Sequence, residues 1–159
     1  MISRLGPAKR AGILAYAAAV LLLTSCSNQD KLAKVRENTV VGTWENSTGE
    51  RVTLHEDHQF NTSAINWDIN LGGESCPKGE TAGTWGFWVD EGKPGGTVIV
   101  STEADSGDAI NLTFEGVQPG ECEITLSVVD GGDTLCATDD PDLACGLDIR
   151  FNRIKPKSR

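Results

Sequence analysis

The sequence predicts an all-β domain of short antiparallel strands, stapled by disulfides, that closes into a small barrel or stacks as a sandwich. Apolar and polar residues alternate with a period of two through most of the chain after Glu37. Turns rich in glycine and aspartate separate these stretches. No stretch after Glu37 has a helical period. The 159 residues correspond to the length of one domain.

The start of the chain has the features of an export signal. Three basic residues precede an 11-residue apolar run, residues 13–23, which is too short to span a bilayer as a stable helix. The residues that follow, Leu23-Thr24-Ser25-Cys26, resemble the lipobox of bacterial lipoproteins. This resemblance implies cleavage before Cys26 and acyl chains, such as palmitate, attached to that residue. The alternative is an ordinary secretory signal followed by a chance cysteine.

We therefore expect a lipid-anchored protein on the extracytoplasmic side of a bacterial cell membrane. Two or three acyl chains on Cys26 would hold it firmly, whereas one chain gives only marginal binding. The signal covers residues 1–25, a polar tether follows at 26–38, the β-domain spans 39–154, and a basic tail ends the chain at 155–159.

The cysteines indicate two disulfides. Removing Cys26 leaves Cys76, Cys122, Cys136 and Cys145, an even number in an exported chain. Cys136 and Cys145 flank a turn-rich stretch, so we pair them and leave Cys76 with Cys122. A zinc site is the alternative, but the spacing contains no C-x-x-C pair.

The charge is strongly acidic in the middle of the chain and basic at both sides of it. The whole chain carries −9, but the region between Glu37 and Ile149 has 3 basic and 22 acidic residues, which gives −19. This balance excludes a nucleic-acid partner, because phosphate binding needs clustered lysine and arginine.

The alternation gives eight strands, or nine with one short addition. Ile110, Leu112 and Phe114, for example, share one face of a strand while polar residues occupy the other face. The strands are expected near 39–45, 50–56, 59–66, 82–89, 96–103, 108–115, 122–129 and 147–154, with the additional one at 133–138.

A Gly-x-Trp motif distinguishes between barrel and sandwich. It opens the domain at Gly42-Thr43-Trp44 and recurs at residues 83–85, and the last strand ends at Arg153. This pattern resembles the lipocalin-like (calycin) barrels. The resemblance implies an up-and-down barrel in which Trp44 lies across one end and Arg153 covers it through a cation–π contact. The alternative for Arg153 is a solvated charge of the basic tail.

The resemblance implies a ligand mouth at the opposite barrel end, with Asn46, Trp67 and Trp88 as candidate lining residues. Asn46 is placed where the related avidin branch has a ligand-binding asparagine, although the mature chain lacks tyrosine and has Glu50 where a biotin-contacting serine would stand. Large aromatics at such positions either pack at the rim or line a ligand wall. The loops expected at this mouth are 46–50, 67–81, 103–108 and 130–133.

The function we expect is binding of a small apolar or amphipathic molecule inside the barrel. The alternative is a protein-interaction or structural module of the cell envelope, with a barrel filled by its own side chains. An internal cavity of about 300 Å³ or more would favour the first function.

We expect no catalysis, no cofactor and no resident metal. His55 and His58 flank Glu56 and Asp57, and side chains of these types can bind a metal ion. The same residues also fit a hairpin turn, which is the interpretation we adopt. The acidic clusters near 103–108 and 139–142 lack the spacing of a calcium loop, although a weak calcium site there is an alternative to turn residues.

Overall fold

The computed structural model describes residues 30–66, 76–92, 96–118, 120–138 and 143–155. Strands dominate the described chain, with one short α-helix and one 3₁₀ turn. The elements in chain order are β1 (Val35–Arg36), α1 (Glu37–Val40), β2 (Gly42–Glu45), β3 (Arg51–Leu54), β4 (Gln59–Asn66), β5 (Lys78–Asp90), β6 (Val98–Ser101), β7 (Ser106–Gly107), β8 (Ala109–Phe114), β9 (Ile124–Val129), η2 (Asp130–Gly132), β10 (Thr134–Thr138) and β11 (Ile149–Arg153).

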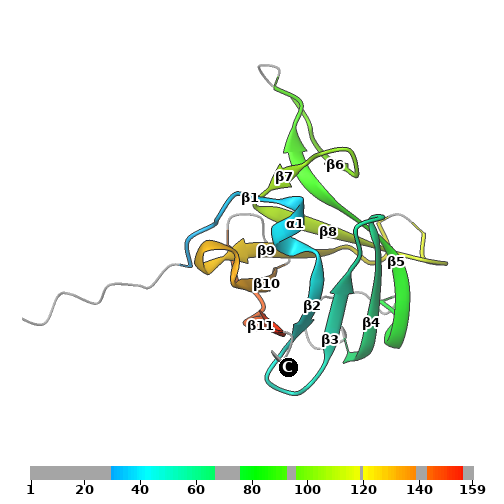
Figure 1. Ribbon diagram of the computed structural model, residues 1–159. Coiled ribbons are helices and arrows are strands. Elements are labelled where there is room, and N and C mark those ends of the chain that lie inside the picture. The colour runs from blue at the N-terminus through cyan, green and yellow to red at the C-terminus, as the bar shows by residue number, and fades with distance from the viewer. Residues whose placement is uncertain (1–29, 67–75, 93–95, 119, 139–142, 156–159) are drawn as a thin grey trace, which may run out of the picture.

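Eight antiparallel strands close into a barrel, as the sequence predicted. The hydrogen-bonded order runs β2-β3-β4-β5-β8-β9-β10-β11, and β11 returns to β2 where Arg153 lies opposite Trp44. Each barrel strand therefore pairs with its neighbour along the chain, and the β6–β7 segment is an excursion between two of them (Figure 1).

Two strand predictions need correction. The strand expected at 96–103 is β6, which pairs with the last four residues of β5 and lies outside the barrel. The optional strand at 133–138 is β10, a full member of the barrel. The reason is the length of β5: its 13 residues extend beyond β4 and β8, so Trp88, Val89 and Asp90 pair only with β6.

Side chains fill the interior of the barrel. On β9, for example, Ile124, Leu126 and Val128 point inward and have no exposed surface. The alternation predicted from the sequence thus separates core from solvent. The largest fully buried side chains are Trp44, Trp85, Phe60, Phe87, Phe151, Leu54, Ile110, Leu112, Ile124, Leu126 and Leu135.

The chain before the barrel is attached to it. Leu32 bridges to Val129, the Ala33 amide donates to the Val128 carbonyl at 2.8 Å, and β1 pairs with β7. Before these contacts, the Arg150 guanidinium holds the Asp30 carboxylate through hydrogen bonds of 2.9 and 2.6 Å. The segment expected as a tether at 26–38 is therefore part of the folded domain from Asp30 onward.

Both disulfides have the expected pairing. Cys76 joins Cys122 across 46 residues, with Cα atoms 5.0 Å apart, and Cys136 joins Cys145 across 9 residues, at 5.1 Å. The first links the starts of β5 and β9, and the second ties β10 to the chain that leads into β11. Among the described residues, no helix is long and apolar enough to cross a membrane.

Candidate functional site: the two barrel ends and the outer wall

The barrel has two different ends. The closed end carries α1, the start of β2 and Arg153 at the end of β11, and the stapled end carries the turn at 46–50 and the two disulfides. Because the strands alternate in direction, residues 55–58, 102–108 and 130–132 lie at the closed end. The sequence placed 103–108 and 130–133 at the opposite mouth, and this assignment is wrong.

Trp44 and Arg153 meet at the closed end. The guanidinium carbon of Arg153 lies 4.5 Å from the centroid of the Trp44 ring, so the expected cation–π contact is present. The Trp44 indole donates to the Val40 carbonyl at 2.8 Å, and Nη1 of Arg153 donates to the Val41 carbonyl at 3.0 Å. Together these contacts tie the last strand and α1 to one buried indole.

The cation at this end is partly withdrawn from water. Burial lowers the pKa of Arg153, and the Asp133 carboxylate acts in the opposite direction. The group stays protonated because an arginine side chain does not lose its proton in proteins. Its Nη2 atom is buried and has no hydrogen-bond partner among the described residues. The Trp44 ring face therefore compensates part of the desolvation of this charge.

Gly42 makes room for the guanidinium. A Cβ at this position would lie 3.1 Å from Nη1 of Arg153, and the backbone there has a φ of +136°. A side chain on residue 42 would meet both a backbone conformation that disfavours it and a crowded neighbour. The glycine of the first Gly-x-Trp motif thus has a steric reason.

Asn46 shapes a turn at the stapled end of the barrel. Its side-chain oxygen accepts hydrogen bonds from the Thr48 amide, the Thr48 hydroxyl and the Glu50 amide, at 2.8–3.0 Å. Its amide nitrogen donates to the Glu50 carboxylate. These contacts define an Asx turn between β2 and β3. The side chain of Asn46 thus has a structural role, and its contact with a ligand stays a prediction.

Trp88 lies on the outer wall, away from Asn46. It follows the inward-facing Phe87 on β5, and its indole donates to the Thr125 hydroxyl on β9 at 3.2 Å. Asn46 is at the stapled end, whereas Trp88 is on the part of β5 that leaves the barrel toward the other end. These two residues therefore do not share a mouth. Trp67, the third candidate, lies outside the described residues.

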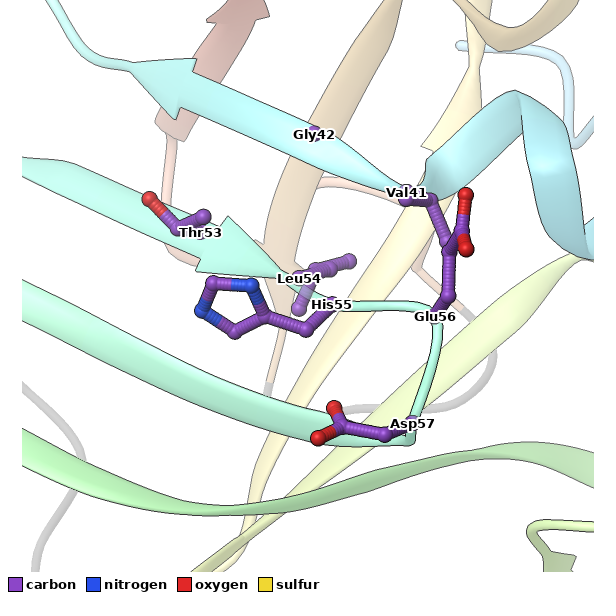
Figure 2. Close-up of a pocket in the computed structure, with 7 residues that line it drawn as sticks. All are labelled: Val41, Gly42, Thr53, Leu54, His55, Glu56 and Asp57. Atoms are coloured by element: carbon purple, nitrogen blue, oxygen red, sulfur yellow. The ribbon is translucent and has the colours of Figure 1, made fainter.

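One pocket formed by described residues lies on the outside of the barrel. It has about 460 Å³, is shallow, and lies over the start of β2 and the turn after β3 (Figure 2). His55 in this pocket is within hydrogen-bond distance of Asn61 at 2.7 Å, and Asp57 accepts the Gln59 amide at 3.1 Å. Figure 2 shows the Glu56 and Asp57 side chains diverging, so no pair of groups converges on one point.

The histidines do not form a metal set. His58 has a φ of +59° in the turn between β3 and β4, as the hairpin interpretation required. Its ring lies 4.5 Å from that of Trp85, and Nε2 is 3.6 Å from the Glu37 carboxylate. His55 points to Asn61 instead. In the described part of the chain, no group of three or more His, Cys, Asp or Glu side chains could hold a metal ion.

One surface feature was not predicted from the sequence. Val98, Ile99 and Val100 on β6 are all exposed, which is unusual for three consecutive large apolar residues in a folded domain. The signal was visible as an apolar run without polar alternation, between a glycine turn and an acidic stretch.

Comparisons with known proteins give no further identification. No protein family, curated protein or solved structure matches the chain.

Proposed function

We propose that this chain is a lipid-anchored protein-binding module of the bacterial envelope, whose partner binds the outside of a filled barrel. The observation that carries the proposal is the packing of the interior. Five aromatic side chains, Trp44, Phe60, Trp85, Phe87 and Phe151, have at most 1% of their surface exposed, and aliphatic side chains occupy the space between them.

This packing argues against a small molecule inside the barrel. Eight strands make a barrel just wide enough for its own side chains. A ligand pocket needs about 300–1,000 Å³ of space. A small apolar ligand would have to displace aromatic side chains that are already out of water, so there would be little gain in burial.

The attached N-terminal segment supports display close to a membrane. Three residues separate Cys26 from Asp30, which is bound to Arg150 on the barrel wall. The four Cα-to-Cα steps from Cys26 to Asp30 reach at most about 14 Å. Acyl chains on Cys26 would then hold the barrel directly at the head groups, where a binding surface meets other envelope proteins.

We propose no enzymatic activity for this module. The two histidines, the side chains best suited to acid–base chemistry at neutral pH, are engaged in turn and packing contacts at the closed end. Neither has a serine, cysteine or lysine partner in the contacts described above.

Native mass spectrometry of the protein purified from its own host tests the filled barrel. We expect the mass of the processed chain with its covalent lipid and no retained small molecule. A non-covalent small molecule retained in one-to-one ratio would overturn the proposal and would favour ligand binding inside the barrel.

Metabolic labelling with a fatty-acid analogue tests the anchor. We expect label on the wild type and none on Cys26→Ala, which should accumulate as unprocessed precursor. Ser25→Gly is the matched control, because it keeps the thiol and a small residue before it. Equal labelling of wild type and Cys26→Ala would contradict the anchor.

A further inference from the structure

Strand β6 is an exposed apolar edge. Val98, Ile99 and Val100 have 55%, 40% and 38% of their surface exposed. Figure 1 shows the β5–β6 hairpin projecting beyond the barrel strands. Among the residues that the structure describes, β6 pairs with β5 alone and ends the sheet. Native proteins usually cover or charge such an edge, because it is a template for another strand.

The free edge presents backbone groups in a defined register. The Glu91 amide donates to the Thr97 carbonyl, and hydrogen-bonded pairs alternate along an antiparallel ladder. Ile99 therefore belongs to the pairs bonded to β5, whereas Val98 and Val100 direct their N–H and C=O groups away from it. Two amides and two carbonyls are thus available to an added strand.

The hairpin is held in place before any partner arrives. Val100 lies opposite Trp88, whose indole is hydrogen-bonded to Thr125 on the barrel wall. On the other face of the hairpin, Val89 packs against the core. A fixed edge loses little conformational freedom when a strand is added.

Acidic residues outnumber basic ones in the segment that carries this edge. Residues 87–109 include one lysine, Lys93, and five acidic residues: Asp90, Glu91, Glu103, Asp105 and Asp108. A second copy of the chain would bring the same charges together, and an anionic bilayer would repel them. A basic segment is the complementary partner.

We propose that β6 binds an extended segment of a partner protein by strand addition, and that apolar side chains alternate with lysine or arginine in this segment. Main-chain hydrogen bonds to Val98 and Val100 supply the pairing, as in other cases of β-augmentation. The apolar side chains of the segment cover Val98 and Val100, and its basic side chains face the acidic surroundings. This inference rests on the proposed function and names the partner class.

Amide hydrogen exchange with synthetic peptides tests the proposal on the full processed chain. The probe is an eight-residue peptide of alternating valine and lysine, and its control replaces each lysine by glutamate. We expect the lysine peptide to slow exchange of the Val98 and Val100 amides at least about tenfold, with a smaller change at Ile99, which is already bonded to β5. We expect the glutamate peptide to give no protection, and higher salt to weaken the lysine peptide.

Variants of Val100 and Val98 distinguish strand addition from nonspecific binding of the peptide. Val100→Pro removes one outward N–H without touching the ladder to β5, and we expect it to weaken the lysine peptide at least about tenfold. Val100→Thr is the matched control, because it keeps the amide and the β-branched shape and should bind nearly as the wild type does. If Val100→Pro does not fold, Val98→Lys tests the same edge by adding a like charge opposite the peptide.

Several results would overturn the inference. These are equal binding of both peptides, equal binding by Val100→Pro and wild type, protection outside β6, or self-association of the chain through β6. Each of them leaves the filled barrel standing, because that is measured separately by the small-molecule content of the purified protein.

Discussion

The two barrel ends are closed by different means. At the closed end, one buried indole, a guanidinium and the short helix α1 cover the core without any covalent link. At the stapled end, two disulfides and the Asx turn of Asn46 hold the connecting loops. Packing therefore stabilises one end mainly through the folded state, whereas disulfides act mainly on the unfolded chain.

This difference has a physical reason in the local sequence. The closed end can bury Val40, Trp44 and Val128, which are completely inaccessible. Two connections at the stapled end, the segments after β8 and β10, are rich in polar and glycine residues. Such loops bury little apolar surface, so a cross-link is an effective way to restrain them.

Trp44→Ala should produce the largest loss of stability. It removes a fully buried indole, the hydrogen bond to Val40 and the partner of Arg153. We expect the free energy of unfolding to fall by about 3–5 kcal/mol. Urea unfolding followed by far-UV circular dichroism measures it. Trp88→Ala, on the outer wall, is the control and should cost clearly less; equal losses would contradict the closure of this end by Trp44.

The two disulfides should differ in their effect. Chain entropy assigns about 4 kcal/mol to the long loop closed by Cys76–Cys122 and about 2.7 kcal/mol to the short loop closed by Cys136–Cys145. Serine pairs replacing each bridge should therefore differ by about 1.3 kcal/mol in unfolding free energy. The measurement is urea unfolding of both variants under identical conditions. A larger loss for the short bridge would show that packing around Cys136, which is fully buried, outweighs chain entropy.

Gly42→Ala should weaken the closed end without removing any contact partner. The added Cβ would meet Nη1 of Arg153, and the positive φ is unfavourable for alanine. We expect a loss of about 1–3 kcal/mol. Gly49→Ala is the matched control, because its φ is also positive but no atom lies within 4 Å of a Cβ there. Thermal unfolding of both variants separates crowding from backbone strain. Identical decreases in Tm would mean that crowding against Arg153 contributes nothing.

Local rules predicted much of this structure. A period of two located most of the barrel strands because alternate side chains face the core, as Ile110, Leu112 and Phe114 show. The short disulfide was predictable because Cys136 and Cys145 flank a turn. The contact between Trp44 and Arg153 depended on the resemblance to calycin barrels, since no local rule brings residues 109 positions apart together.

The predictions that failed depend on non-local geometry. The position of β6 outside the barrel follows from how far β5 extends beyond β8, and periodicity does not encode the length of a neighbouring strand. The structural role of Asn46 was predictable, because an asparagine followed by Ser-Thr-Gly is a turn signature. The attachment of the N-terminal segment was missed because Asp30 finds its partner Arg150 across 120 residues.

The smallest effect should come from this attachment, which lies outside both ends. Hydrogen bonding from Arg150 lowers the pKa of Asp30 in the folded chain below its ordinary 3.8. A lowered folded pKa means that the pair stabilises the attachment above the unfolded pKa, and that this stabilisation is lost as the pH falls through the folded value.

At neutral pH, Asp30→Asn should therefore speed exchange of the Ala33 amide, which is bonded to Val128, while global unfolding changes little. The excess exchange over wild type should shrink as the pH falls through the lowered pKa of Asp30, because the wild-type carboxyl then becomes neutral as well. Asp148→Asn is the control, since that carboxylate is almost fully exposed and lies 3.8 Å from Nε of the same arginine. If Asp148→Asn accelerates hydrogen exchange of the Ala33 amide as much as Asp30→Asn does, the effect comes from general charge near Arg150 and not from the specific pair with Asp30.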